Sequence, residues 1–221
     1  MNGMEFAVYI KGKVGDGLTQ ERAMDSQKAI DHALMRRVQQ EDYQAFEELV
    51  GRYKARLVNL LYRMLNDQSE AEDLVQETFL RVWTHRQDYD FSYCLSTWIY
   101  TIALNLAKNE LRRYRKFKFI NLLDMAAKGI ELPDPKMGPS ALGHMLQQAI
   151  LSLPAKYKTA FLLRDVEQMS YEEVAQILGV PLGTVKSRVN RARAELKEQL
   201  KPKLEQSRAL SQGALVPVRS M

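Results

Sequence analysis

The sequence predicts an all-helical protein built from two small domains, and three observations carry this expectation. Apolar residues recur at three- and four-residue steps along the long segments, which is typical of helices with one buried face. No run alternates apolar and polar residues with the period of two that a half-buried strand would show. The segment 120–142 contains three prolines and two glycines, so it interrupts the helical pattern and indicates a domain boundary.

The chain of 221 residues divides at this boundary. We expect an N-terminal domain over residues 30–118, a flexible linker over 119–142 and a C-terminal domain over 143–201. Residues 1–29 form an N-terminal extension and residues 202–221 a tail. Both ends are expected to be loose because they show little helical periodicity.

Composition narrows the class of protein. Apolar residues make up 46% of the chain, enough for a packed core, and the net charge of +5 is a mild basic excess. Cys94 is the only cysteine, so neither an intrachain disulfide nor a cysteine-based zinc cluster can form. No secretory signal and no apolar stretch of about 20 residues is visible, so we expect a cytoplasmic protein without membrane insertion.

The sequence gives little support to the hypothesis that the protein is an enzyme. His32, His85 and His144 lack metal-ligand spacing, and no glycine-rich loop is suited to cradle a phosphate. We therefore expect no catalytic residue, no cofactor and no bound metal.

The charges are grouped by sign. Residues 66–80 hold five acids and no base, residues 108–118 hold six bases and one acid, and residues 186–203 hold seven bases and two acids. Separate patches of opposite sign indicate more than one partner surface.

The C-terminal segment 170–196 predicts a helix-turn-helix. Ser170 and Glu173 form a capping-box pattern at the start of the first helix, and Gly179 suits the left-handed residue that ends it. The second helix buries the apolar face Val185, Val189, Ala192, Leu196 and Leu200. On its other faces it carries Thr184, Lys186, Ser187, Arg188, Asn190 and Arg191. Such hydrogen-bonding and cationic groups reach base edges and phosphates, so this helix is expected to bind duplex DNA.

A second nucleic-acid surface is indicated by the long helix expected over residues 96–116. Its polar and basic stripe consists of Thr101, Asn105, Lys108, Arg112 and Arg115, with Trp98 beside the head of the stripe. The preceding loop carries Tyr89, Phe91 and Tyr93. Aromatic rings next to cationic groups suit unpaired bases and their phosphates. The alternative is that these aromatics belong to the core and that the stripe is only a solvated face.

The acidic helix around residues 69–83 presents Asp73, Gln76, Glu77 and Leu80 outward. This face would repel DNA, and an exposed leucine among acids is suited to anchor a basic protein surface. The alternative is an ordinary solvated helix with one exposed leucine.

Taken together, these stretches resemble the extracytoplasmic-function (ECF) sigma factors, a compact group of sigma subunits of bacterial RNA polymerase. The resemblance covers about residues 30–200 and is carried by four motifs in order: "LMRRVQQEDYQAFEELVGRY", "AEDLVQETFLRVW", "STWIYTIALNLAKNELRR" and "SYEEVAQILGVPLGTVKSRVNRARAEL". It implies a sigma region 2 helical bundle followed by a sigma region 4 helix-turn-helix. Residues 1–29 extend beyond the usual start of the family, and Asn190 occupies one of its variable positions.

The resemblance also implies roles for particular residues. Core RNA polymerase would bind through the clamp helices of its largest subunit to Asp73, Gln76, Glu77 and Leu80. The −10 promoter element would be captured during melting by Trp98, Ile102, Asn105, Lys108, Asn109, Arg112 and Arg113. The −35 element would be read by Lys186, Ser187, Asn190 and Arg191. An anti-sigma factor is a further expected partner.

The resulting hypothesis is a sigma factor that binds core polymerase and both promoter elements, as duplex and as melted strand. The alternative is a transcriptional regulator with a single DNA-binding surface, which would bind a palindromic duplex site as a dimer and need no particular polymerase.

Overall fold

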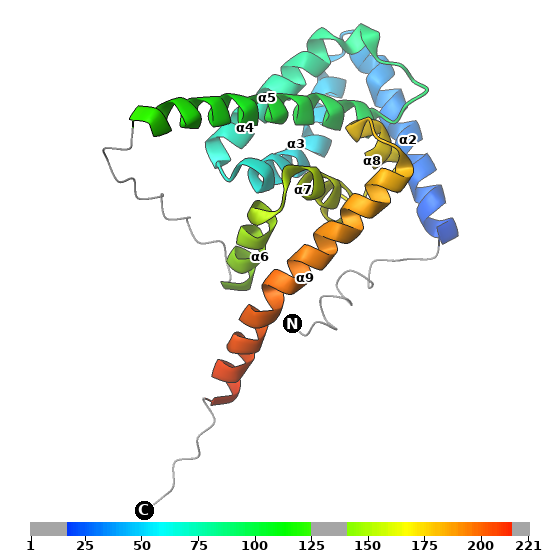
Figure 1. Ribbon diagram of the computed structural model, residues 1–221. Coiled ribbons are helices and arrows are strands. Elements are labelled where there is room, and N and C mark those ends of the chain that lie inside the picture. Colours follow the sequence, from blue (N-terminus) through cyan, green and yellow to red (C-terminus); the bar gives the residue numbers. More distant parts are fainter. Residues whose placement is uncertain (1–16, 125–140, 214–221) are drawn as a thin grey trace, which may run out of the picture.

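A computed structural model describes residues 17–124 and 141–213 of the chain, with side-chain positions for residues 27–113 and 145–201. Every regular element in these ranges is helical (Figure 1), so the expectation of an all-helical fold is confirmed. The helices form an N-terminal and a C-terminal half on either side of the segment 125–140.

The N-terminal half contains α2 (Gly17–Gln39), α3 (Tyr43–Leu65), α4 (Gln68–Thr84), the 3-10 turn η1 (Arg86–Asp88) and α5 (Leu95–Asp124). Aspartate caps start two of these helices: the side chain of Asp42 accepts a hydrogen bond from the Ala45 amide, and that of Asp67 from the Glu70 amide, each at 3.0 Å. Helix α3 ends at Asn66, whose φ of 60° places it in the left-handed region. These signals make the turns between α2, α3 and α4 short, so the three helices pack side by side.

The C-terminal half contains α6 (Ala141–Ser152), α7 (Ala155–Phe161), the π-helical turn η2 (Leu162–Val166), α8 (Tyr171–Leu178) and α9 (Leu182–Gly213). Helix α9 packs against α6, α7 and α8 and then projects beyond the rest of the described chain (Figure 1). The ion pair between Arg193 of α9 and Asp165 of η2, with Nε and Oδ2 2.9 Å apart, ties the long helix to this turn.

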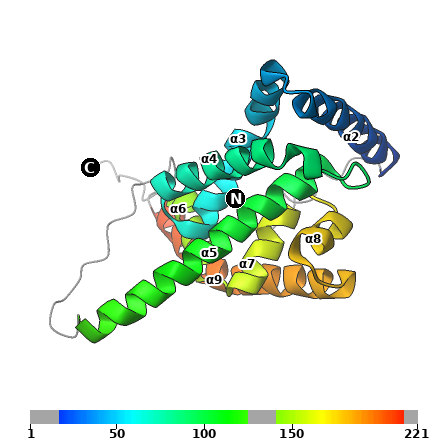
Figure 2. The ribbon, with the colours of Figure 1, turned by 90° about the horizontal axis from the view of Figure 1, so that it is seen from above.

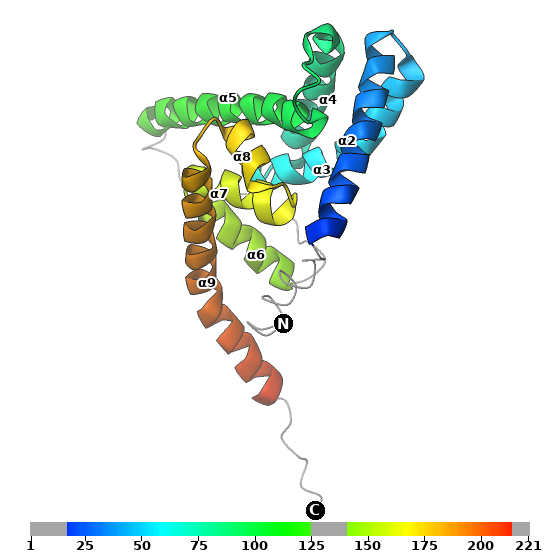
Figure 3. The same ribbon diagram turned by 90° about the vertical axis from the view of Figure 1, so that its right-hand side faces the viewer.

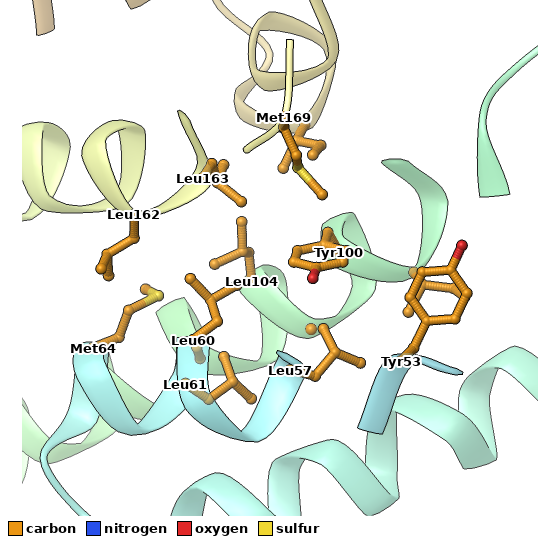
Figure 4. Packing of buried hydrophobic residues seen from close by; sticks show 14 of the residues in the cluster. Tyr53, Leu57, Leu60, Leu61, Met64, Tyr100, Leu104, Leu162, Leu163 and Met169 are labelled. Carbon is orange, nitrogen blue, oxygen red and sulfur yellow. The ribbon is translucent and has the colours of Figure 1, made fainter. Parts of the chain in front are cut away.

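The two halves pack directly against each other. Figure 2, seen from above, and Figure 3, seen from the side, both show α8 next to α5, and α3 also contacts α6. Figure 4 shows the residues that form this junction: Leu162, Leu163 and Met169 lie against Leu57, Leu60, Met64, Tyr100 and Leu104. The buried residues of both halves therefore form one continuous hydrophobic core.

Three helices extend past the expected boundaries. Helix α2 begins at Gly17, inside the extension that we expected to be loose, and α5 continues to Asp124, inside the expected linker. Helix α9 continues through position 202 to Gly213, inside the expected tail. Residues 119–124 contain neither proline nor glycine, so nothing in the sequence stops α5 there.

Candidate functional site

The helix-turn-helix is formed by α8 and α9. The Ser170 hydroxyl accepts a hydrogen bond from the Glu173 amide at 3.1 Å, and the Glu173 carboxylate accepts one from the Ser170 amide at 2.8 Å. This is the expected capping box. Gly179 has a φ of 63°, and α9 then starts at Leu182. The turn therefore has the geometry that the sequence predicts, and it orients the first turns of α9.

Helix α9 buries its predicted apolar face, with Val185, Val189, Ala192 and Leu196 all fully buried. Of the predicted DNA-binding residues, Lys186, Ser187, Asn190 and Arg191 are exposed, whereas Thr184 and Arg188 are half-buried. The helix therefore presents four polar or cationic side chains to solvent within two turns. Contact of these residues with DNA stays a prediction.

Two tyrosines that the sequence reasoning missed lie beside these cations. The guanidinium of Arg191 donates a hydrogen bond to the Tyr157 hydroxyl at 3.0 Å, and this bond lowers the pKa of Tyr157 below its usual range. The ring of Tyr171 lies beneath Arg164 at 4.8 Å and Lys186 at 5.8 Å, measured to the ring centroid. The tyrosines come from α7 and α8, so spacing along α9 alone gave no signal for them.

Helix α5 carries the predicted strand-capture surface. Asn105, Asn109, Arg112 and Arg113 are exposed, while Trp98, Ile102 and Lys108 are half-buried. Arg113 forms an ion pair with Glu110 at 2.8 Å. The side chain of Arg115, which the stripe included, lies outside the described residues. The exposed positions share one face because they recur at three- and four-residue steps.

A cavity of about 280 Å³ opens at the head of this stripe. It is lined by Asp88, Tyr89, Asp90, Tyr93, Thr97, Trp98 and Thr101, and by Gln176 of α8. Thr97 is only 5% exposed, and its hydroxyl has no hydrogen-bond partner. A buried polar group without a hydrogen-bond partner is energetically costly.

The loop aromatics divide between core and surface. Tyr89 is buried and packs on Trp98, with ring centroids 5.2 Å apart, whereas Tyr93 is half exposed. The alternative interpretation of these aromatics as core residues is therefore correct for Tyr89. The rest of the loop leaves one aromatic ring available to solvent beside the cavity.

Helix α2 holds this loop in place, which the sequence reasoning did not anticipate. His32 Nε2 lies 3.0 Å from the Tyr93 carbonyl oxygen, and the His32 ring meets the edges of Tyr89 and Phe91. Because a carbonyl can only accept, the Nε2 atom must carry the proton. The Tyr89 hydroxyl donates to the same carbonyl at 2.7 Å, so two bonds converge on one loop residue.

The acidic face lies on α4. Asp73 and Gln76 are exposed, Leu80 is 59% exposed, and Glu77 is half-buried because it pairs with Arg81 at 2.7 Å. The four residues therefore line one face of α4, and their role in docking stays a prediction.

A groove of about 460 Å³ continues this face between α3 and α4. Gln76 and Leu80 belong to its lining, together with Tyr43, Phe46, Val50, Lys54, Val75, Phe79 and Trp83. Tyr43 is 68% exposed and stacks on Trp83, with ring centroids 4.9 Å apart. Helical spacing alone would place Phe46 and Val50 on the buried stripe of α3, yet both are half-buried and line the groove.

Neither a metal site nor a membrane span is found in the described residues. No group of three or more His, Cys, Asp or Glu side chains there is placed to hold a metal ion. The helices over residues 17–124 and 141–213 are each too short or too polar to cross a bilayer.

Comparison with known proteins gives a consistent result. Family models described as Sigma-70 region 2 and Sigma-70, region 4 match residues 49–117 and 143–196. The ECF RNA polymerase sigma factor SigW of Bacillus subtilis is 33% identical over 177 residues, which cover 76% of this chain and 95% of that protein. The RNA polymerase sigma-H factor of Pseudomonas aeruginosa is 34% identical over 187 residues, which cover 80% and 97% of the two chains.

A solved structure is similar in both sequence and fold. The sigma factor RpoE from Bartonella quintana, solved in complex with the anti-sigma factor NepR, is 28% identical with a TM-score of 0.57. The match covers 71% of this chain and 96% of that chain.

Proposed function

The chain belongs to the ECF sigma factors of bacterial RNA polymerase, and from this premise we propose which of its surfaces bind core polymerase and which bind each promoter element. The observation that carries the proposal is that the three predicted residue sets lie on three separate helices, α4, α5 and α9. Each helix presents a different chemistry to solvent. The protein carries no catalytic chemistry of its own and works in the cytoplasm by binding.

Helix α4 binds core polymerase. Asp73 and Glu77 supply negative charge, and Leu80 together with the groove beside Tyr43 supplies apolar surface. This combination fits the clamp helices of the largest subunit if their surface is basic with apolar anchors. Because Leu80 and Tyr43 are largely exposed in the free chain, docking would bury apolar area without any rearrangement of α4.

Helix α5 and its loop capture the −10 element as a melted strand. The cavity beside Trp98 can hold one extruded base, and the Thr97 hydroxyl can hydrogen-bond its edge. Extrusion costs a few kcal/mol, whereas stacking on an aromatic ring contributes about 1–3 kcal/mol per base. Phosphate contacts from Arg112 and Arg113 offset the part of the extrusion cost that stacking does not cover. These contacts also make the binding depend on salt concentration.

Helix α9 reads the −35 element as duplex DNA. Lys186 and Arg191 are suited to guanine edges or phosphates, and Ser187 and Asn190 to hydrogen bonds with base edges. An anti-sigma factor is a further proposed partner, supported by the complex in which the similar Bartonella quintana protein was solved.

Reconstituted transcription tests the proposal. Core polymerase freed of its own sigma subunit is mixed with this chain and with random-sequence DNA, and initiating templates are selected. We expect a shared upstream and downstream element among the selected promoters. Absence of core binding together with absence of any selected promoter would overturn the sigma assignment, and a palindromic site bound without polymerase would favour the regulator instead.

Two variants separate the docking surface from the duplex-reading surface. Asp73→Ala combined with Glu77→Ala should weaken core binding and leave −35 discrimination intact. Arg191→Ala should do the reverse, losing about 1–3 kcal/mol of discrimination at one position of the −35 element. Exposed Glu48→Gln on α3 serves as the matched charge control, because it removes a carboxylate outside both surfaces.

A further inference from the structure

Tyr157, a residue of α7, contacts the exposed face of α9 through Arg191. The Arg191 guanidinium donates a hydrogen bond from Nη1 to the Tyr157 hydroxyl at 3.0 Å, and its Cζ lies 6.0 Å from the centroid of the Tyr157 ring. Helices α7 and α9 pack against each other, so the two residues meet although they are 34 positions apart in sequence. One cation of the proposed duplex-reading surface is therefore held by a neighbouring helix.

The hold on Arg191 restricts a side chain that is otherwise among the most flexible in proteins. Arginine loses a large rotamer entropy when a binding partner fixes it in one conformation. Arg191 is exposed, so apolar packing does not fix its guanidinium in the free protein. The bond to Tyr157 fixes it before DNA arrives. A group that already has its binding geometry loses less entropy on association, and it binds more selectively for that reason.

The bond to Tyr157 leaves most of the Arg191 guanidinium available to DNA. A guanidinium carries five N–H donors in a rigid, planar fork. The bond to Tyr157 uses Nη1, so the pair of donors on Nε and Nη2 stays open for a second partner. Such a pair matches O6 and N7 of guanine, which is the commonest specific contact of arginine in the major groove. The arrangement therefore keeps the donors that recognise a guanine edge.

The Tyr157 hydroxyl, and not only its ring, interacts with the guanidinium. The hydrogen bond from Arg191 is the main cause that lowers the pKa of Tyr157, and the same bond raises the pKa of Arg191. Both directions mean that the hydroxyl favours the charged form of the arginine. The ring has a separate partner, because Lys156 Nζ lies 5.0 Å from its centroid. Removal of the hydroxyl alone therefore removes the directed contact to Arg191.

The chemistry of the partner distinguishes Arg191 from Arg193, which lies two residues further along α9. Arg193 is half-buried and pairs with the Asp165 carboxylate, with Nε and Oδ2 2.9 Å apart. A carboxylate neutralises the charge of its partner, so this pair stabilises the fold and adds little attraction for DNA. A protonated phenol carries no charge. Tyr157 therefore orients the Arg191 guanidinium and leaves its positive charge to attract DNA.

Resting on the proposed function, we propose that Tyr157 is a positioning residue of the −35 surface: its hydroxyl holds the Arg191 guanidinium in place for a base edge. Tyr157 thereby sets how strongly α9 discriminates between bases at the one position that Arg191 reads. It acts through Arg191 and makes no base contact of its own. Without the hydroxyl, Arg191 would still attract phosphates, which carry no sequence information, but would discriminate less between bases.

The proposal is tested with holoenzyme reconstituted from core polymerase and the full chain. A promoter selected with the wild type supplies a set of duplex fragments, each altered at one position of the −35 element. Competition binding gives, for every position, the ratio of affinities for the preferred base and for the other three. The position that Arg191 reads is the one at which Arg191→Ala abolishes this ratio, and we expect the preferred base there to be guanine.

Tyr157→Phe removes the hydroxyl and keeps the ring. At the position that Arg191 reads, the affinity ratio should fall by roughly threefold to tenfold, the effect of one lost hydrogen bond, while the other −35 positions keep their ratios. Tyr171→Phe is the matched control: it removes a hydroxyl beside Arg164 and Lys186 and keeps the bond between Tyr157 and Arg191. An unchanged ratio in Tyr157→Phe, or an equal fall at every position, would overturn the positioning role.

A double-mutant cycle separates positioning from direct contact. In a chain that carries Arg191→Ala, the further change Tyr157→Phe should alter no affinity ratio. A remaining effect would mean that Tyr157 itself contacts a base, and it would overturn the proposal. Full discrimination in Arg191→Ala would overturn the role of Arg191 in reading the −35 element, and with it that of Tyr157. A loss in Arg191→Ala without any loss in Tyr157→Phe would overturn the positioning role alone.

Discussion

Two buried tyrosines make the stability of this protein sensitive to alkaline pH. Burial raises the pKa of Tyr53 and of Tyr100 far above the ordinary value of 10.0, and each phenol donates to a carboxylate, Asp31 or Glu167. The folded state therefore holds the neutral form. The stability that these groups contribute is fully present below pH 10 and is lost as the pH rises above it.

We predict that the free energy of unfolding measured with denaturant declines above pH 10 and that the phenolate absorbance of these two residues appears only with unfolding. The combined Tyr53→Phe and Tyr100→Phe variant provides the control, since its stability should depend less on pH in this range. A pH dependence identical to that of the wild type would contradict the assignment.

His32 holds the loop beside the proposed strand-capture surface. We predict that His32→Ala weakens binding of the −10 single strand by roughly twofold to tenfold, the effect of losing one hydrogen bond, and leaves duplex −35 binding unchanged. Fluorescence anisotropy with the two DNAs checks this. His32→Gln keeps an N–H donor for the Tyr93 carbonyl and should restore part of the affinity; an equal loss in both variants would argue against the hydrogen bond.

Single residues were predictable where their role depends on neighbours along the chain. The exposure of Leu80 and the burial of Val185 and Val189 follow from helical spacing alone. Tyr157 and His32 were missed because their partners, Arg191 and Tyr93, are 34 and 61 residues away in sequence. Spacing along one helix carries no information about such contacts.

At the scale of elements, α8 depends on its cap. A helix of 8 residues is too short to be stable by itself, and its capping box satisfies two backbone donors at its start. We predict that Ser170→Ala lowers the free energy of unfolding by about 1 kcal/mol. Denaturant unfolding measures the change. Exposed Glu172→Gln in the same turn is the control, and an equal loss there would show that the cap is not the cause.

Element positions were predictable where stop signals are local. Ser170, Glu173 and Gly179 fix the limits of α8 because each acts within one turn of the chain. The turn η2 was not anticipated, because a π-helical turn has no such residue signature. The end of α5 was missed because residues 119–124 contain neither proline nor glycine. The end of α9 was missed for the opposite reason, because the helix continues through Pro202, a residue that usually breaks a helix.

At the scale of the molecule, the continuous core couples the two halves. We predict one cooperative thermal transition for the full chain in calorimetry, because Leu60 and Leu104 of one half pack against Leu162 and Leu163 of the other. Glu167→Ala should broaden or split this transition. Two well-separated transitions in the wild type would contradict the coupling.

The packing of the halves could not be predicted from the sequence. Helical spacing predicts that an apolar residue of α3, such as Leu61 or Met64, is buried, but it does not indicate which half of the chain covers that residue. Charge gave no indication either, since Arg56 and Glu167 are 111 residues apart. The sequence therefore predicted the two domains and the linker between them. It did not predict that the two domains pack against each other.

The turn η2 sets the direction in which Glu167 points. The Glu167 amide donates to the Leu162 carbonyl, five residues back, at 2.9 Å, so this turn holds one more residue than a turn of α-helix. Deletion of one residue here would restore α-helical spacing and rotate the chain beyond the turn by roughly 100°, the angle per residue of an α-helix with 3.6 residues per turn. Glu167 would then face away from Arg56 and Tyr100. The length of this one turn therefore decides whether Glu167 reaches the other half of the chain.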